Sequence, residues 1–176
     1  MHKNIVKYVL LIALLIGGCA ADMASKKWAK DNLKDKHGIT IIHGLTELGF
    51  AENRGMVFGI LNNGKTGVHS YFLLGVRILI LIGVCGFLVV KRREPVWFHV
   101  PFILIVAGAW GNILDSLTAG HVVDFIHIHA LNLLDWPFLF NIADAYICVG
   151  IGFLIIKSLF VKKSVVDKKD IPVSPV

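Results

Sequence analysis

Four long apolar blocks constrain the fold of this chain more than any other feature of its sequence. They are residues 5–21, 71–90, 96–114 and 142–161. Each is close to the roughly 20 apolar residues that a helix needs to cross the hydrocarbon layer of a membrane. The composition agrees, because 56% of the 176 residues are hydrophobic and they are bunched rather than spread by the periodicity of a soluble domain. We therefore predict an all-α membrane protein with four transmembrane helices.

Charge predicts the orientation of these spans. Lys and Arg gather before the first block, in the KRRE segment at 91–94, and after the fourth block. Short loops rich in Lys and Arg stay on the cytoplasmic side, and all three clusters share one side of a four-span protein. We expect both termini to be cytoplasmic, with residues 22–70 and 115–141 facing outward. The net charge of +6 is read as this signal, because no basic stretch is interleaved with aromatic residues as in nucleic-acid-binding surfaces.

The segment between the first and second blocks predicts a small extracytoplasmic β-element. A Lys-rich polar stretch comes first, and β-branched residues with Gly and Asn-Gly turn signals follow at about 38–68. Residues 1–163 then form a single membrane domain, and residues 164–176 a polar cytoplasmic tail. The three cysteines show no CxxC or metal-binding spacing, so we expect no disulfide.

The first block has a second interpretation. It ends in IGGC, and a basic start, an apolar stretch and small residues before a cysteine are typical of a lipoprotein-type signal peptide. In that case Cys19 would carry the lipid and the first span would be lost. We favour the retained span.

Three carboxylates lie where the third and fourth blocks meet the outward side: Asp115, Asp124 and Asp144. One aspartate at a helix end is usually a cap or an interfacial residue, but three on the same side of a membrane favour a function. Two carboxylates about 3–5 Å apart cannot both ionise easily. The ionised member can activate water while the protonated member polarises a carbonyl group. This is aspartic peptidase chemistry, with no metal and no acyl-enzyme.

Two of these acids share a local pattern, which is GNILD at 111–115 and FNIAD at 140–144. The spacing places Asn112 with Asp115, and Asn141 with Asp144, on one helical face. The residues alone do not establish which two acids form the pair, although this pattern favours Asp115 with Asp144.

Five short segments resemble those of lipoprotein signal peptidase, also called signal peptidase II, and they occur in that family's order. They are DMASK (22–26), NRGMVFG (53–59), GNILD (111–115), GHVVDF (120–125) and WPFLFNIADAY (136–146). The resemblance implies a membrane aspartic endopeptidase that removes signal peptides from diacylglyceryl-modified prolipoproteins, cutting just before the lipid-modified Cys. The resemblance also implies a bacterial inner membrane, with the active site near its outer face. We expect membrane lipids as further partners, no cofactor, no metal, no nucleic acid, and a monomer.

The resemblance also implies roles for individual residues. The catalytic pair becomes Asp124 and Asp144, which replaces the pattern-based choice of Asp115. The residues implied in substrate binding are Asn53, Gly55, Asn112, Asp115 and Asn141. Asp22 and Lys26 would brace the end of the first span against the outer structure, and otherwise they form a surface ion pair of little energetic value.

The chain departs from the family at Ser116, where the family usually has Arg after the Gly-Asn-x-x-Asp aspartate. The missing cation could contact substrate backbone or tune the acid pair. His121 and Arg54 are candidates to replace it. We expect Arg77, inside the second block, to extend its charged end toward the outer interface.

Two other interpretations use the same residues. His121, Asp124, His127 and His129 are dense enough to suggest a metal, but on a helix they point in different directions, and IHIHAL is better read as an interfacial amphipathic segment. A small proton- or cation-coupled transporter would use the carboxylates as carriers. Such a transporter should place its acids near the middle of the bilayer, whereas these lie at helix ends.

Overall fold

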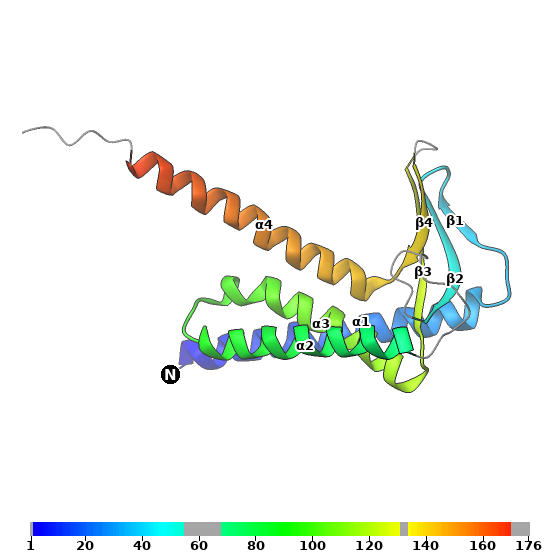
Figure 1. Cartoon of the computed structure of the whole chain (residues 1–176), viewed down its shortest axis with the longest axis horizontal. Helices are drawn as coiled ribbons and strands as arrows, with labels where there is room; N and C mark the ends of the chain where they lie inside the picture. The colour runs from blue at the N-terminus through cyan, green and yellow to red at the C-terminus, as the bar shows by residue number, and fades with distance from the viewer. Residues whose placement is uncertain (1, 55–67, 131–133, 170–176) are drawn as a thin grey trace, which may run out of the picture.

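The computed structural model describes residues 2–54, 68–130 and 134–169, and these form four helices and one four-stranded sheet (Figure 1). The helices are α1 (His2–Leu33), α2 (Val68–Val90), α3 (Val96–Thr118) and α4 (Ile142–Lys169). The strands are β1 (Ile39–Ile42), β2 (Thr46–Asn53), β3 (Val122–Ala130) and β4 (Leu134–Phe140). The sheet stands at the end of the helices opposite the N-terminus.

Each helix contains a stretch long and apolar enough to cross a membrane. These stretches are Ile5–Leu33, Tyr71–Val90, Val96–Thr118 and Ile142–Phe160. Their outward side chains are apolar and exposed, as expected where lipid replaces water: Ile80 is 55% exposed and Phe153 is 57% exposed. The prediction of a four-helix membrane fold is confirmed.

Helix α3 packs against all three other helices. Its close approach to α4 depends on Gly108, because a Cβ atom there would collide with the carbonyl oxygen of Ala143 in the first turn of α4. Small residues let helix backbones approach in this way, and in lipid such packing replaces the hydrophobic effect as the force between helices. The start of α4 is thereby fixed against α3.

The sheet has the order β1-β2-β3-β4, and every neighbouring pair is antiparallel. Its contact with the helices is a small apolar cluster, in which Val123 and Phe125 of β3 pack on Ala29 and Leu33 of α1. The last turns of α1 therefore support β3. The strands β2 and β3 pair so that Ala51 lies opposite Asp124.

Two helices run further than the apolar blocks that predicted them. Helix α1 runs on to Leu33, past the predicted span end at residue 21, and its 32 residues measure about 48 Å, more than a hydrocarbon layer of about 30 Å requires. It is continuous through Cys19, which supports the retained first span. Helix α4 continues to Lys169, so residues 164–169 of the predicted polar tail are helical.

The prediction of the sheet was incomplete, and the helix geometry applied to the histidines of IHIHAL does not hold. Only the segment at 38–68 was expected to be β-structure, but half of the described strands come from the connection between α3 and α4. The described residues of the IHIHAL segment, 126–130, lie in strand β3. Its alternation of apolar and polar residues has period two, the signal of a strand, and the helical periodicity applied to it did not hold. Residues 55–67 and 170–176 lie outside the described chain.

Candidate active site

Polar side chains from α1, β2, α3, β3 and the start of α4 meet where the helices join the sheet. They are Asp22, Lys26, Asn53, Asn112, Asp115, Asp124, Asn141 and Asp144. Five of these residues are buried, and each of the eight has a polar partner within the group. A buried polar group is costly unless it is paired, so the cluster forms a connected network rather than a set of isolated side chains.

Asp124 is 3% exposed and accepts a hydrogen bond at each carboxylate oxygen. Oδ2 accepts from Nδ2 of Asn53 at 2.9 Å, and Oδ1 accepts from Nδ2 of Asn141 at 2.6 Å. Burial raises the pKa of Asp124 to about 6, and the charge of Asp144 adds to the rise, while the two amide hydrogen bonds oppose it. Asp124 can therefore gain and lose a proton close to neutral pH.

Asp144 lies in the first turn of α4, three residues after Asn141, which caps the helix. Oδ1 of Asn141 accepts from the backbone N–H of Asp144 at 3.1 Å, and Oδ2 of Asp144 accepts from the backbone N–H of Asn141 at 3.2 Å. This is a capping box built from Asn and Asp. The positive end of the helix dipole favours a negative charge at this position.

Two asparagine side chains connect the acids. Nδ2 of Asn141 donates to Asp124, and also to Oδ1 of Asn112 at 3.2 Å. Nδ2 of Asn112 donates to Oδ1 of Asp144 at 2.8 Å. Asp124 and Asp144 are thus held in one hydrogen-bonded unit, although they come from a strand and a helix separated along the chain.

Lys26 anchors this unit from α1. Its Nζ donates to Oδ1 of Asn112 at 2.9 Å. The same atom lies 2.7 Å from Oδ2 of Asp22 and 2.9 Å from Oδ2 of Asp115. Lys26 is 4% exposed, so its charge needs these two carboxylates, and they in turn need Lys26.

Asp22 ties α1 to α4. Its Oδ1 accepts from the backbone N–H of Ala143 at 3.0 Å, one of the free donors in the first turn of α4. The Asp22 carboxylate fits against α3 only because residue 111 is glycine, since a Cβ atom at Gly111 would collide with the carboxylate. The sequence pattern gave no sign of this requirement for Gly111.

The structure brings together the residues that were predicted for the site, with one exception. Gly55 lies outside the described residues. Asp115 is close by but differs in its surroundings, because it pairs with Lys26 and is not bound to Asn141. The pair suggested by the local Asn-Asp pattern is therefore not the pair that Asn141 joins.

Arg77, which was expected to extend its charged end toward the outer interface, lies near Ser116. Nη1 of Arg77, from α2, lies 3.4 Å from Oγ of Ser116. The two proposed substitutes both face Glu52 instead, with His121 Nε2 and Arg54 Nη2 each 3.8 Å from one of its oxygens. Arg77 is thus nearer to the position where the family carries Arg.

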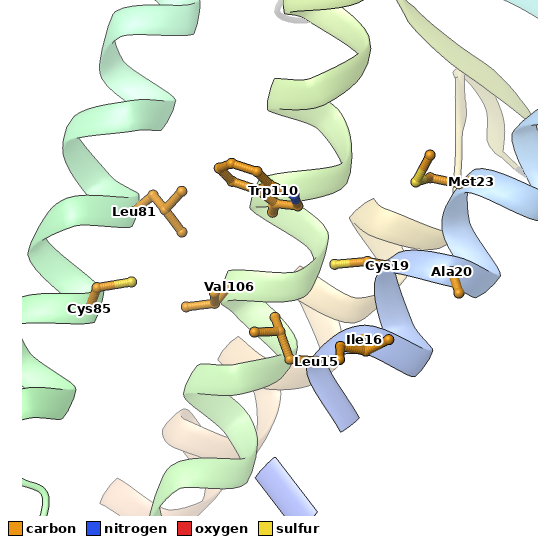
Figure 2. A pocket seen from close by; sticks show the side chains of 9 residues that line it. All are labelled: Leu15, Ile16, Cys19, Ala20, Met23, Leu81, Cys85, Val106 and Trp110. Carbon is orange, nitrogen blue, oxygen red and sulfur yellow. The ribbon is translucent and has the colours of Figure 1, made fainter. Parts of the chain in front are cut away.

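An apolar cavity of about 530 Å³ lies beside the site, between α1, α2 and α3 (Figure 2). Its lining residues are Leu15, Ile16, Cys19, Ala20, Met23, Leu81, Cys85, Val106 and Trp110. Met23 and Trp110 directly neighbour Asp22 and Gly111 in the sequence, so one end of the cavity lies at the same level of the helices as the polar network. Leu15 also lines a second cavity, of about 350 Å³, toward the other end of α1.

The metal set considered from the sequence does not form. It placed Asp124 with three histidines on a helix, whereas the segment is strand β3, where neighbouring residues point to opposite faces. Asp124 belongs to the acid pair, and His121 faces Glu52.

Fold and site together define an integral membrane protein with a pair of carboxylates, the buried Asp124 and the partly buried Asp144, in one hydrogen-bonded unit, the arrangement that aspartic peptidases use. The sequence model of the family described as "Signal peptidase (SPase) II" matches residues 12–160. A lipoprotein signal peptidase of Clostridioides difficile is 35% identical over 153 residues, which is 87% of this chain and 95% of that relative. One from Clostridium novyi is 37% identical over 139 residues, covering 79% and 90% of the two chains.

Two solved structures share the fold. Both are described as a bacterial membrane enzyme structure by the in meso method. One, at 2.3 Å resolution, has a TM-score of 0.73 at 28% identity and covers 94% of each chain. The other, at 1.9 Å, has a TM-score of 0.69 at 28% identity, with 85% of this chain and 92% of that one covered. The chain belongs to the signal peptidase II family and is an aspartic peptidase, which replaces the transporter interpretation.

Proposed function

We propose that this enzyme removes signal peptides from diacylglyceryl-modified prolipoproteins with Asp124 and Asp144 as its catalytic pair, cutting just before the lipid-modified Cys. The observation that carries the proposal is the position of Asn141, which binds both acids. Membership of the signal peptidase II family supports the reaction, and the hydrogen bonds support the choice of residues.

The two acids differ in a way that assigns their roles. Asp124 is buried and has a raised pKa, so it holds the proton of the pair, and a substrate that excludes water raises its pKa further. Asp144 lies at the positive end of α4 and acts as the ionised base. The pair shares one proton during the reaction.

Hydrolysis then follows in two stages, each with two proton transfers. Asp144 removes a proton from a water molecule, whose oxygen attacks the carbonyl carbon of the scissile peptide bond. Asp124 gives its proton to the carbonyl oxygen as the tetrahedral intermediate forms. When the C–N bond breaks, Asp144 protonates the departing amine, and Asp124 regains its proton from the collapsing diol. One water is consumed and both acids return to their starting states.

Asparagines surround the pair and set its geometry. We propose that Asn53, Asn112 and Asn141 hold the carboxylates, as their hydrogen bonds show, and that they contact substrate backbone together with Asp115. Gly55 is proposed for the same role on its sequence motif alone. Asp22 and Lys26 act as structural support, because they link α1 to α3 and to the start of α4.

The charge distribution supports a site at the outer face of the membrane. At the end of the helices away from the sheet, Nζ of Lys7 donates to the backbone oxygens of Arg92 and Glu94, at 2.7 and 2.6 Å. The basic residues of the N-terminus and of the α2–α3 turn therefore lie together, and the positive-inside rule places that end in the cytoplasm. Both termini are then cytoplasmic, and the sheet with the acid pair is extracytoplasmic.

The apolar cavity beside the site fits the lipid of such a substrate. Its walls are apolar side chains of three membrane-spanning helices, so it exposes few groups that would need water (Figure 2). Acyl chains can lie there while the peptide bond next to the modified Cys reaches the acids. We propose that one chain is sufficient, since all the site residues described come from a single copy.

The substrate class is tested by mass spectrometry of the cleavage products. A prolipoprotein with the diacylglyceryl group and the same protein without it are incubated with the detergent-purified enzyme. Cleavage of the lipidated form alone, with the new N-terminus at the modified Cys, is expected. Equal cleavage of both forms would overturn the lipid requirement.

The cavity is tested with its own cysteines. Cys19 and Cys85 line it, whereas Cys148 of α4 is exposed and not part of its lining. A lipidated substrate peptide should slow the reaction of an apolar maleimide with Cys19 and Cys85 and leave Cys148 unchanged. Equal protection of all three cysteines would contradict the proposed lipid site.

A further inference from the structure

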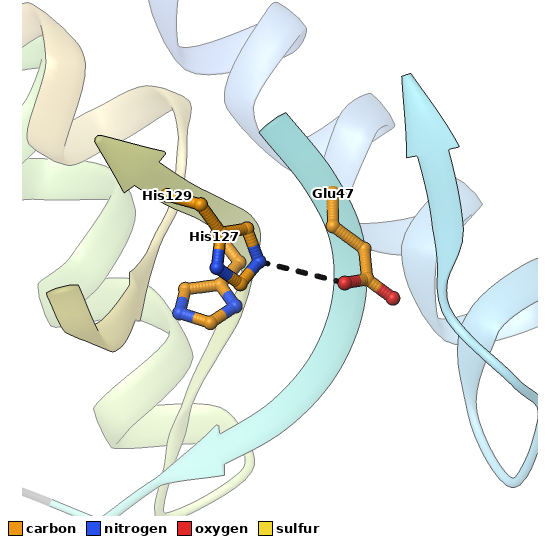
Figure 3. A group of neighbouring side chains, drawn as sticks. All are labelled: Glu47, His127 and His129. Carbon is orange, nitrogen blue, oxygen red and sulfur yellow. Dashed lines mark ion pairs between the residues drawn. The ribbon is translucent and has the colours of Figure 1, made fainter. Parts of the chain in front are cut away.

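Two histidines of β3 and one glutamate of β2 form a cluster on the sheet, apart from the acid pair (Figure 3). The residues are Glu47, His127 and His129. Each offers one ligand atom, and these atoms all lie within 4.8 Å of one another. We propose that this cluster binds a divalent transition-metal ion, with Zn²⁺ as the best match.

Strand geometry explains why the three side chains meet. Glu47 lies directly opposite His127 in the β2–β3 register, and such partners project from the same face of an antiparallel pair. His129 follows His127 by two residues and so shares that face. The backbone N–H of His129 donates to the carbonyl oxygen of Leu45 at 2.7 Å, so the pairing continues through the cluster.

The side chains already face one another. The imidazole rings of His127 and His129 have centroids 4.1 Å apart. Nε2 of His129 lies 3.5 Å from Oε2 of Glu47, the contact drawn in Figure 3. The side chains of His129 and Glu47 are 26% and 39% exposed, so an ion can reach the cluster from solvent.

The donor set selects the kind of ion. Two imidazole nitrogens and one carboxylate oxygen suit Zn²⁺ and its neighbours, whereas Mg²⁺ and Ca²⁺ prefer oxygen ligands. Zinc bonds of about 2.0–2.2 Å place tetrahedral ligand atoms about 3.3 Å apart. The three ligand atoms already lie within 4.8 Å of one another, so small side-chain rotations bring them to this spacing, and a water molecule completes the fourth position.

The ion would join the two strands that carry part of the acid site. Asn53 ends β2, and Asp124 lies three residues before His127 on β3. At about 3.3 Å per residue, the proposed ion lies about 10 Å along the strand from Asp124. Its effect is therefore on the pairing of β2 with β3 and not on the chemistry at the acids.

The test uses the full chain in detergent, without a polyhistidine tag and after chelator treatment, with ZnCl₂ as the probe. We expect one bound Zn²⁺ per chain by elemental analysis after gel filtration, and a thermal midpoint that rises with Zn²⁺ concentration. His127→Gln combined with His129→Gln should abolish both effects. Glu47→Gln should weaken binding by more than the roughly 10- to 100-fold that the loss of an outer-shell partner causes. His37→Gln, an exposed histidine outside the cluster, should change nothing.

Equal metal content in the wild type and the double variant, whether one ion or none, would overturn the proposal. If the double variant does not fold, a measurement on the wild type alone still tests the proposed ligands. Cu²⁺, which binds such sites more tightly than Zn²⁺, should show two coordinated imidazoles by pulsed electron paramagnetic resonance. One imidazole or none would contradict the assigned ligands.

Discussion

Nδ2 of Asn141 lies 2.6 Å from Oδ1 of Asp124, so the residue that caps α4 also holds an acid on β3. The same Asn141 exchanges two hydrogen bonds with Asp144. A helix cap thereby sets the relative position of two carboxylates. Capping and catalysis can be separated by mutation at this one residue.

Asn141→Ser keeps a good capping side chain but removes the amide that donates to Asp124. We expect its thermal midpoint to stay near that of the wild type while cleavage falls by about 100-fold or more, an effect of the size seen when a positioned polar group is lost. Asn141→Ala should lose activity and also about 1 kcal/mol of stability. A serine variant with wild-type cleavage would show that the amide is not needed.

The hydrogen bond from Asn53 lowers the pKa of Asp124. This hydrogen bond favours the ionised carboxylate, so Asn53→Ala should raise the pKa of Asp124 above about 6. Because the reaction needs one proton on the pair, kcat/KM of the wild type should fall as the pH rises above about 6, and this limb should move to higher pH in the variant. If the fall in kcat/KM occurred at the same pH in the variant and the wild type, Asn53 would have no effect on the pKa of Asp124.

Asp124 should make the fold less stable once it ionises. The pKa of Asp124 in the folded state, about 6, lies above the ordinary value of 3.8, so the folded protein binds this proton more tightly than the unfolded chain does. The contribution of this proton to the free energy of unfolding is complete below about pH 4 and is lost as the pH rises through about 6. Asp124→Asn cannot ionise, and should exceed the wild type in stability by up to about 3 kcal/mol at neutral pH, but not at about pH 4. Thermal midpoints in detergent measure this, with the exposed Asp31→Asn as a control that should show no such trend.

Replacing Lys26 should strongly destabilise the fold. Lys26→Met leaves the buried Asp22 and the partly buried Asp115 without their cation, and breaking a buried ion pair costs about 3–5 kcal/mol. Lys27→Met is the matched control, because Lys27 pairs with Asp31 where both side chains are exposed. Adding Asp22→Asn and Asp115→Asn to Lys26→Met should restore much of the lost thermal stability, and its failure to do so would contradict this explanation.

Arg77 should serve the substrate in place of the missing cation at Ser116. Its guanidinium reaches Ser116 from α2, so Arg77→Met should raise KM several-fold with little change in kcat. Adding Ser116→Arg to Arg77→Met should lower KM again. A lowered kcat at constant KM, or no rescue, would assign Arg77 a different role.

The sequence predicted the elements whose signals are local and long. Apolar blocks of about 20 residues identified the spans, and basic clusters predicted their orientation. The sheet was only half predicted, because β3 forms by pairing with β2 and β4 by pairing with β3, and the apolar-polar alternation of β3 was read with a helical period. The cluster of Glu47 with His127 and His129 depends on strand register, which no local pattern reports.

In the acid site too, local sequence patterns were informative and contacts between distant residues could not be predicted. The Asn-Asp pattern drew attention to Asp144, but it favoured Asp115 as partner, because Asn and Asp have the same spacing in both segments. The structure instead gives Asp115 to Lys26 and brings Asp124 to Asn141 through the strand. Only the family resemblance selected Asp124, because the contacts that single it out join residues distant along the chain.

The most direct measurement is cleavage of a diacylglyceryl-modified prolipoprotein, followed by gel shift, with the wild type, Asp124→Asn, Asp144→Asn and Asp115→Asn. With all four proteins folded by thermal midpoint, the wild type should cut and Asp115→Asn should retain measurable activity. Asp124→Asn and Asp144→Asn should each lose about 10⁴-fold or more. Cleavage by Asp124→Asn near the wild-type rate, with none by Asp115→Asn, would contradict the proposed pair.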